Sequence, residues 1–432
     1  MIKIKLDLVQ VEKLIPLFSI LTVLLICSWW VYSINRSGAD RGLDFSVFYI
    51  AGKTWAIGQS PYDRGEYIKQ YNIFESKTAQ KDIVERSVFV GVPTLAPYVT
   101  LISRLNWAAA RVVHEWLNFL AWAGVVYFSH YIVRRKVGVK KIHYYSLVCF
   151  GFGSVYSSVV ACIVMGQTGI FALLGGLGLV YSWRENKIFL GVFFIILASF
   201  KPQVSFLLLL YVLLRGWWRP FVLSAAVLIL CFVFYEYPAG LNMFWARFSH
   251  DLLAYAQWGF NSDIRNRIGA MGLIAYFIND PLIAQLLCVA LAVCAVVGLC
   301  GLASFNFHRR GIVRLNSESE LLWINHVFTI LIISPLLMPF YVYDLVTAPA
   351  CLILTSILRC SKTKLIAFIS IALLARPGAG VRPDMPIIGS LSAYFPQILV
   401  ISTSLIFLTL LIFELKCRAL NPRASPKVHG SL

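Results

Sequence analysis

The sequence predicts an all-α protein that crosses a lipid bilayer many times. Of its 432 residues, 59% are apolar and only 13% are charged, and the mean hydropathy is +0.76. Soluble domains contain about 45–50% apolar and about 25% charged residues, so this chain has too few polar side chains to cover a surface that faces only water. Its apolar runs are continuous and do not alternate with period two, which argues against a transmembrane β-barrel.

The apolar segments predict about 12 membrane spans, since about 20 apolar residues cross a bilayer once. The first segment, 14–34, is too long for a signal-peptide core, and we expect an uncleaved anchor. The segment 92–105 is expected not to cross, because its crossing would place the basic residues of 134–141 outside the cell. The thirteen apolar segments are 14–34, 92–105, 107–133, 143–165, 168–183, 187–200, 203–214, 220–237, 282–305, 321–338, 343–358, 364–375 and 389–413.

The net charge of +18 is carried mostly by basic residues in short connections between apolar segments. Short loops rich in Lys and Arg mark the cytoplasmic side of a membrane protein. Topology therefore explains the charge, and we expect membrane lipids and no nucleic acid as partners. The basic residues concerned are Arg134, Arg135, Lys136, Lys140, Lys141, Arg215, Arg219, Arg309, Arg310, Arg314, Arg359, Lys362, Lys364, Lys416, Arg418, Arg423 and Lys427.

We expect a single integral membrane domain over residues 1–432. The stretch 35–91 contains eight basic and seven acidic residues, so it is nearly neutral and is expected to be the first extracytoplasmic loop. The stretch 238–270 is rich in aromatic residues and is expected to be a second extracytoplasmic loop along the membrane surface. The basic tail, 416–432, is expected in the cytoplasm.

No motif in the sequence requires a metal ion or a cofactor, and we expect neither. The ten cysteines form no CxxC pair, and none lies in the two long loops, which argues against a disulfide framework and a zinc site. The glycine clusters have the wrong spacing for a phosphate or dinucleotide loop and are better explained by helix packing.

Asp44 stands at the start of a stretch with helical spacing in the first long loop. Positions 45, 48, 49, 52 and 55 recur at this spacing and predict an amphipathic helix at the outer interface. Asp44 could cap that helix, or pair with Arg36 or Arg41. It could instead present a carboxylate just outside the membrane as a general base. These interpretations remain open on the sequence alone.

Lys201 lies inside the otherwise uncharged run 189–214. A lysine at the bilayer centre costs about 2.5–3.5 kcal/mol on insertion scales, so it should be paired or face a polar cavity. Pro202 disfavours helix at the preceding residue, which predicts two half-helices that meet at Lys201. The lysine could snorkel to the membrane interface, or it could bind a lipid-linked phosphate.

Two further polar stretches interrupt apolar segments. Gln167 lies in the first, and a tight turn in which Gln167 caps neighbouring backbone is the simplest interpretation. The second follows Ser334-Pro335 and contains Tyr343 and Asp344, the only acidic residue between positions 321 and 383. Asp344 could be a helix N-cap. Its neighbouring prolines and aromatic residues would also suit a sugar pocket.

Taken in order, these residues resemble glycosyltransferase family 87 over about residues 40–360. The chain departs from many relatives in two motifs: it has a single proline, Pro93, where they carry Tyr-Pro-Pro, and it lacks their Trp/His motif after Ser-Pro. The resemblance rests on Asp44-Phe45 with Tyr49, Gly58, Pro61 and Tyr62, then on Gly166-Gln167, Lys201-Pro202, Ser334-Pro335 and Tyr343-Asp344-Leu345.

The resemblance implies a GT-C-fold enzyme of the bacterial plasma membrane, related to polyprenol-phosphate-mannose-dependent α-mannosyltransferases. It implies transfer of a hexose, with mannose favoured, from a polyprenyl-phosphate sugar donor to a lipid-linked or glycan acceptor, at the periplasmic or external face and with inversion. No DxD motif is present, which argues against a nucleotide-sugar donor. Asp44 would be the general base. The lysine's own chemistry and position suggest that Lys201 stabilises the leaving phosphate. Residues expected to bind substrate are Tyr49, Tyr62, Gln167, Gln203, Tyr343 and Asp344.

Two other functions remain open. Proline-broken half-helices and an intramembrane lysine also characterise transporters, so the chain could be a transporter or flippase of lipid-linked saccharides. Inverted repeats would favour that function, and no convincing similarity between the two halves is evident. The departures from the family motifs also allow a non-catalytic scaffold in an envelope-assembly complex.

Overall fold

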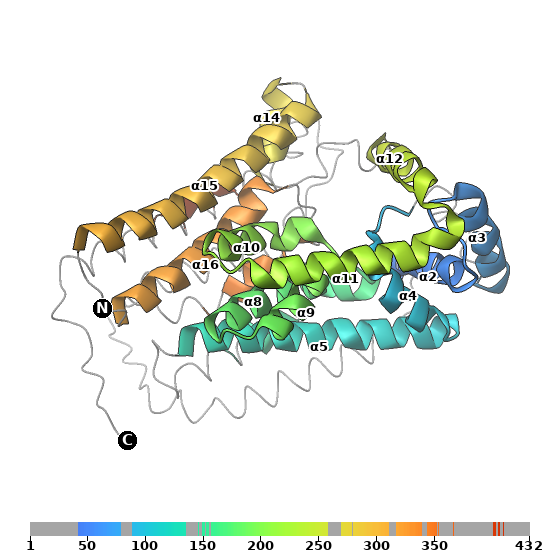
Figure 1. Ribbon diagram of the computed structural model, residues 1–432, viewed down its shortest axis with the longest axis horizontal. Coiled ribbons are helices and arrows are strands. Elements are labelled where there is room, and N and C mark those ends of the chain that lie inside the picture. The colour runs from blue at the N-terminus through green and yellow to red at the C-terminus, as the bar shows by residue number, and fades with distance from the viewer. Residues whose placement is uncertain are drawn as a thin grey trace, which may run out of the picture.

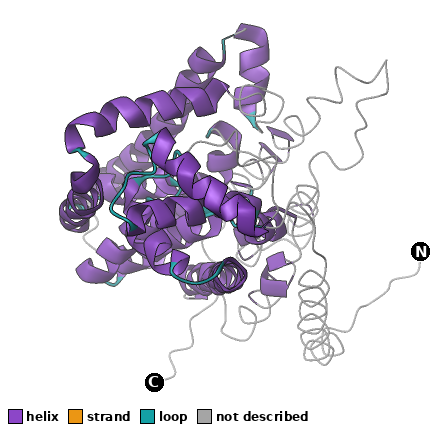
Figure 2. Cartoon of the chain, turned by 90° about the vertical axis from the view of Figure 1, so that its right-hand side faces the viewer, coloured by secondary structure: helices purple, strands orange, loops and turns teal. Residues whose placement is uncertain are grey.

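A computed structural model describes residues 42–78, 89–134, 157–257, 269–278, 280–310, 317–338 and 344–351, together with isolated positions near 150 and beyond 352. Within these residues the chain is helical and contains no strand (Figure 2). The predicted all-α class is confirmed for this part of the chain. The expected N-terminal anchor and the expected cytoplasmic tail lie outside the described residues.

The helices divide into a group at one end of the molecule and a larger group of long and short apolar helices (Figure 1). The end group comprises α2 (Leu43–Ala56), α3 (Arg64–Thr78), the 3-10 helix η1 (Pro93–Leu95), α4 (Ala96–Ser103) and α12 (Leu241–Gln257). The other helices are α5 (Trp107–Arg134), α7 (Ser157–Met165), α8 (Gly169–Arg184), α9 (Ile188–Ala198), α10 (Pro202–Leu214), α11 (Arg219–Glu236), the 3-10 helix η2 (Tyr237–Ala239), α14 (Ala270–Ile278), α15 (Pro281–Arg310), α16 (Ser317–Leu337) and α17 (Thr347–Ala350).

Three helices of the described part are long and apolar enough to cross a membrane, namely α5, α11 and the stretch Leu282–Gly301 of α15. Helices α7 and α8 together would make a fourth, bent by 116° at the break between them. Helix α4, in the segment expected not to cross, has eight residues. At 1.5 Å per residue it is about 12 Å long, well short of a hydrocarbon core of about 30 Å.

Proline and glycine explain why several apolar helices are short. Lys201 has φ −149° and ψ 77°, an extended conformation that separates α9 from α10, as Pro202 predicts. Gly166, between α7 and α8, has φ +78°, which L side chains rarely adopt. A Cβ at Gly166 would lie 2.3 Å from the Cβ of Phe45 in α2, so only glycine fits there. Both breaks fall where the sequence places polar residues.

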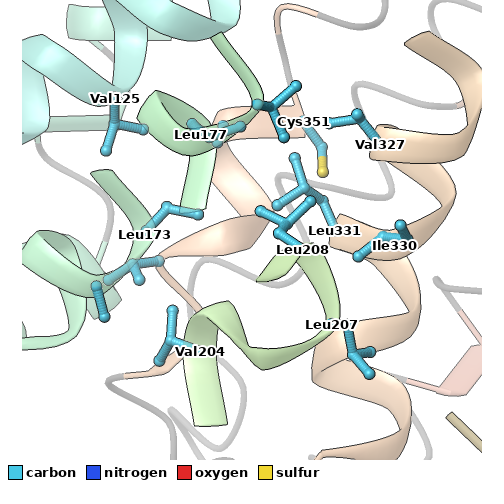
Figure 3. Close-up of a cluster of buried hydrophobic side chains, with 14 of the residues drawn as sticks. Val125, Leu173, Leu177, Val204, Leu207, Leu208, Val327, Ile330, Leu331 and Cys351 are labelled. Carbon is cyan, nitrogen blue, oxygen red and sulfur yellow. The ribbon is translucent and has the colours of Figure 1, made fainter. Parts of the chain in front are cut away.

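The larger group of helices packs around an aliphatic core. Helices α5, α8, α10 and α16 contribute most of it, and Figure 3 shows their Val, Leu and Ile side chains converging. The seven cysteines of the described part are free thiols, and five of them are buried in the manner of small apolar residues. We call this set of buried residues, which runs from Ala121 to Ile353, the membrane core.

The end group is held by a different core, which we call the aromatic outer cluster. More than half of its buried residues are aromatic. Helix α2 lies in its middle, and even the polar side chains of Ser46 and Thr54 are fully buried. The expectation of an amphipathic helix is therefore only partly met, because α3, α4 and α5 cover most of its surface. The buried residues are Phe45, Tyr49, Ile50, Ala51, Trp55, Tyr62, Tyr67, Tyr71, Phe74, Phe89, Leu95, Ala96, Val99, Ile102, Ala110 and Phe244.

Two long helices connect the aromatic outer cluster with the far end of the molecule. Helix α11 begins at Arg219 and ends at Glu236, whose carboxylate accepts a hydrogen bond from the Trp55 indole at 2.8 Å. Helix α5 begins at Trp107, which packs on the ring of Phe45, and ends at Arg134. The basic ends of both helices therefore lie away from the outer cluster (Figure 1).

Candidate active site

Four residues that the sequence singled out meet at the seam between the aromatic outer cluster and the membrane core. The side-chain amide of Gln167 donates to Oδ2 of Asp44 at 2.5 Å. On its other side, the amide oxygen of Gln167 accepts from Nζ of Lys201 at 2.9 Å. Lys201 in turn forms an ion pair with Oδ1 of Asp344 at 2.6 Å. The four side chains thus form one continuous polar chain.

Gln167 owes its position to the break between α7 and α8. The backbone turns at Gly166, so that the amide N–H of Gln167 donates to the carbonyl of Cys162 at 2.8 Å. The expected tight turn is therefore present. The Gln167 side chain does not cap backbone, however, because both ends of its amide group are bonded to Asp44 and Lys201.

Lys201 stands at the break between α9 and α10 and exposes only 9% of its surface. Its ammonium group lies against the buried carboxylate of Asp344 inside the protein. A buried ammonium group requires such a partner, since an unpaired charge would lose its hydration without compensation. The expectation that Lys201 is paired is met by a residue that lies 143 positions further along the chain.

Asp344 is fully buried and lies just before α17. It does not cap that helix, since the N-cap residue is Val346. Gly169 passes close to the ion pair, and a Cβ on this glycine would lie 3.7 Å from Oδ1 of Asp344 and 3.9 Å from Cδ of Lys201. The start of α8 is thus packed directly against the charged pair.

Asp44 lies in the first turn of α2, whose N-cap is Gly42. The N–H of Gly42 donates to the carbonyl of Val164 at 2.7 Å, which ties the start of α2 to the end of α7. Burial of its carboxyl group raises the pKa of Asp44 above the ordinary value of 3.8. The hydrogen bond from Gln167 and the charge of Lys201 act in the opposite direction, whereas the negative charge of Asp344 raises the pKa further.

The arrangement combines the groups that a group-transfer reaction needs. Asp44 offers a carboxylate with increased basicity, and it lies in the first turn of α2, next to Phe45 of the aromatic outer cluster. Lys201 offers a positive charge about two hydrogen bonds away. With Asp44 ionised, the cluster holds two carboxylates and one ammonium group and is negatively charged. When Asp44 takes up a proton, the charges of Lys201 and Asp344 cancel and the cluster becomes neutral.

The comparison with known families matches the model of glycosyltransferase family 87 to residues 89–339, more than half of the chain. The chain belongs to glycosyltransferase family 87. It is therefore a membrane glycosyltransferase, and the resemblance seen in its motifs is confirmed. No curated protein and no solved structure matches the chain significantly. Gln167 and Lys201 lie inside the matched region of family 87, Asp344 lies five residues beyond its end, and Asp44 lies 45 residues before its start.

The other residues expected to bind substrate in this family 87 chain are not joined to the cluster by hydrogen bonds among the described residues. The Tyr49 hydroxyl donates to the carbonyl of Leu105 at 2.8 Å, and the Tyr62 hydroxyl donates to the carbonyl of Gly91. Both rings are buried in the aromatic outer cluster. Gln203 is half-buried in the first turn of α10, two residues after Lys201. Tyr343 lies outside the described residues.

One further residue of this family 87 chain, His114, touches the seam and was not predicted from the sequence. It is fully buried in α5, and its ring stacks on Phe45 with 4.3 Å between centroids. Its Nε2 lies 3.0 Å from the carbonyl oxygen of Gly166. A signal was present, since ionisable residues inside an apolar span usually have a function. The polar residues His114, Glu115 and Asn118 interrupt the apolar sequence of α5.

Proposed function

We propose that the chain transfers a hexose, with mannose as the favoured sugar, from a polyprenyl phosphate to a hydroxyl group of a lipid-linked or glycan acceptor, with inversion at the anomeric carbon. The observation that carries this proposal is the chain of contacts from Asp44 through Gln167 to Lys201. It brings a candidate base and a candidate phosphate-binding cation together within one site. Family membership supplies the reaction class, and the cluster supplies residues that could perform it.

Asp44 is proposed to act as the general base. Its carboxylate would take the proton of the acceptor hydroxyl while the hydroxyl oxygen forms a bond to the anomeric carbon of the sugar. The bond between that carbon and the phosphate oxygen breaks on the opposite face, which inverts the configuration. A raised pKa suits this role, because a carboxylate that binds a proton more tightly is a stronger base.

Lys201 is proposed to stabilise the phosphate as it leaves. The departing polyprenyl phosphate gains negative charge, and a fixed ammonium group stabilises charge most where water is scarce. In the structure Asp344 already neutralises Lys201, so the phosphate would share the ammonium group with this carboxylate. Asp344 would then hold Lys201 in place and moderate its attraction for the phosphate. Gln203 and Tyr343 remain proposed contacts of the substrate.

The tyrosines Tyr49 and Tyr62 are proposed to act less directly. Both hydroxyl groups are already bonded to backbone carbonyls, which supports a role in holding the loop that carries Asp44. Their rings pack edge-on against neighbouring aromatic rings, a favourable arrangement of aromatic pairs. These tyrosines would therefore affect sugar binding indirectly, by fixing the shape of the outer cluster.

We propose a GT-C-type fold with about 12 spans and with the aromatic outer cluster on the extracytoplasmic side of a bacterial plasma membrane. The gathering of α2, α3 and α12 at one end supports this orientation, since their sequences form the two near-neutral or mixed loops. The basic ends of α5 and α11 at the opposite end support it as well, because Lys and Arg concentrate on the cytoplasmic side.

The proposal is tested with purified protein in liposomes, supplied with radiolabelled polyprenyl phosphomannose or polyprenyl phosphoglucose and a panel of lipid acceptors. Asp44→Asn should lower transfer by about 100- to 10,000-fold, the usual contribution of a general base. Glu66→Gln is the matched control, because it makes the same type of change on α3, outside the cluster. Full transfer by Asp44→Asn would refute the base assignment.

The same liposomes separate transfer from transport. Transporters also contain broken helices and buried charged residues. The break at Lys201 and its buried ion pair with Asp344 are therefore the observations that favour this second function. Movement of the labelled lipid across the bilayer without any covalent product would support a flippase. A labelled glycoside that carries the acceptor, formed in proportion to donor consumed, would support the transferase.

A further inference from the structure

His114 contacts both elements that carry the Asp44–Gln167 hydrogen bond. Its ring stacks on Phe45, the residue next to Asp44 in α2, with an interplanar angle of 18°. Its Nε2 lies 3.0 Å from the carbonyl oxygen of Gly166, the residue next to Gln167. One buried ring on α5 thus bridges the helix that holds the carboxylate and the turn that holds the amide.

The hydrogen bonds of His114 define its protonation. The carbonyl of Gly166 can only accept, so Nε2 carries the hydrogen. The Nδ1 atom, 2.6 Å from the hydroxyl of Tyr98 in α4, then accepts from that hydroxyl. Asn118, one turn along α5, has its amide nitrogen 2.9 Å from Nε2, but both nitrogens are donors, and this amide nitrogen donates to the backbone carbonyl of His114 at 3.3 Å. A neutral imidazole with one defined tautomer therefore satisfies every contact with α4 and with the turn.

No space separates the two elements that the ring joins. A Cβ on Gly166 would lie only 2.3 Å from the Cβ of Phe45, so the turn and α2 touch directly. The backbone bond from Gly42 to Val164 is a second tie between the same elements. A rotation of the turn relative to α2 would therefore strain both the contact of Gly166 with His114 and the bond from Gly42 to Val164.

We propose that His114 is a positioning residue that holds the amide of Gln167 in the orientation in which it donates to Asp44. This inference rests on the proposed role of Asp44 as the base. His114 does not touch the reacting atoms in this account. It acts through Gly166 and Phe45, and its loss would weaken a hydrogen bond that stabilises the ionised carboxylate.

The test is the titration of the Asp44 carboxyl group. For each variant, the infrared spectrum is compared with that of the same variant carrying Asp44→Asn, and the difference isolates the Asp44 carboxyl group. Its pH dependence gives the titration without substrate, and the acid limb of kcat/KM gives it during transfer. His114→Phe keeps an aromatic ring on Phe45 and removes both nitrogen atoms. We expect the titration and the acid limb to move up by about one pH unit, which corresponds to the loss of one hydrogen bond to a charged group.

Matched variants separate positioning from a general loss of packing. The charged groups that face Asp44, Lys201 and Asp344, are unchanged in His114→Phe. In His114→Gln the side-chain amide can still donate to the carbonyl of Gly166, so Asp44 should titrate nearly as it does in the unaltered protein. His130→Phe makes the same substitution about four turns further along α5 and should cause no shift.

A double-variant cycle shows whether His114 acts through Gln167. Gln167→Leu alone should move the Asp44 titration up, and adding His114→Phe should move it little further, because the hydrogen bond is already absent. Fully additive shifts would show that the two residues act separately and would overturn the inference. Tyr98→Phe serves if His114→Phe does not insert. It removes only the hydroxyl at Nδ1 and should give a smaller upward shift, and no shift would overturn the inference as well.

The inference and the proposed function fail in different ways. If Asp44→Asn keeps full transfer, the proposed function fails, whatever the titration of Asp44 shows. If Asp44→Asn abolishes transfer but His114→Phe titrates as the unaltered protein does, only the positioning role of His114 fails.

Discussion

The aromatic outer cluster and the membrane core solve different packing problems. In the outer cluster, rings such as Tyr49, Trp55 and Tyr62 bury large surfaces and also bond their polar tips to backbone or to Glu236. In the membrane core, aliphatic side chains from α5, α8, α10 and α16 interdigitate with few polar atoms (Figure 3). Aromatic residues with polar tips suit a region that meets both lipid and water.

The contrast explains where the polar cluster lies. Asp44 comes from the outer cluster, whereas Gln167, Lys201 and Asp344 come from breaks in or beside the helices of the membrane core. Neither region alone contains both a candidate base and a candidate cation. The site exists only where the two regions meet, so changes at the seam should affect transfer more than equal changes within either region.

After Asp44→Asn, the greatest loss of transfer is expected at Lys201. Lys201→Met should lower kcat by about 100- to 1,000-fold, as loss of one preorganised charge-stabilising group does in other enzymes. It should also destabilise the fold by about 3–5 kcal/mol, because the carboxylate of Asp344 loses its buried partner. Transfer assays and thermal unfolding in detergent measure the two effects.

A second substitution separates these two consequences. Adding Asp344→Asn to Lys201→Met removes the stranded charge and should recover much of the lost stability without recovering transfer. Lys69→Met on the exposed surface of α3 is the control for loss of a lysine. Recovered transfer in the double variant would mean that Lys201 serves only the fold.

The next effect is a pair of opposite shifts in pH dependence. The base must be ionised, so kcat/KM should fall as the pH drops through the raised pKa of Asp44. Gln167→Leu removes a hydrogen bond that lowers this pKa and should move the acid limb up by about one pH unit. Asp344→Asn removes a negative charge that raises it and should move the limb down.

The pH profile of kcat/KM in liposomes checks both signs. Gln59→Leu, at an exposed glutamine after α2, should leave the limb in place. Shifts in the same direction for Gln167→Leu and Asp344→Asn would contradict the electrostatic account of Asp44.

The smallest effect is expected inside the aromatic outer cluster. Tyr62→Phe removes the hydroxyl that donates to the carbonyl of Gly91 and should lower the free energy of unfolding by about 1 kcal/mol. The KM for the donor should not change, because this hydroxyl serves the backbone. A higher KM with unchanged thermal unfolding would instead support direct binding of the sugar by Tyr62.

Local sequence features predicted much of this molecule. Continuous apolar runs predicted the all-α class, and the order of motifs predicted the family. Pro202 predicted the break at Lys201, because proline restricts the residue before it regardless of context. Gln167 and Asp344 stood out because they interrupt apolar segments, and Asp44 stood out because it begins a stretch with helical spacing.

Contacts between distant segments could not be predicted in the same way. The sequence offered a snorkelling lysine and a helix-capping aspartate as alternatives, and only the tertiary packing pairs Lys201 with Asp344. The tyrosines Tyr49 and Tyr62 seemed suited to a sugar, but their hydroxyls are bonded to backbone carbonyls 56 and 29 residues away. His114 was missed because its function depends on the neighbours Phe45 and Gly166.

We propose above all that the donor phosphate and the base meet at the seam. A cryo-EM structure of the protein with a non-transferable phosphonate analogue of a polyprenyl phosphosugar tests it most directly. We expect phosphonate density within hydrogen-bond reach of Lys201 Nζ, with the anomeric carbon between the phosphonate and the carboxylate of Asp44. Phosphonate density elsewhere, for example at the arginine-rich end near Arg184 and Arg215, with the seam unchanged, would contradict it.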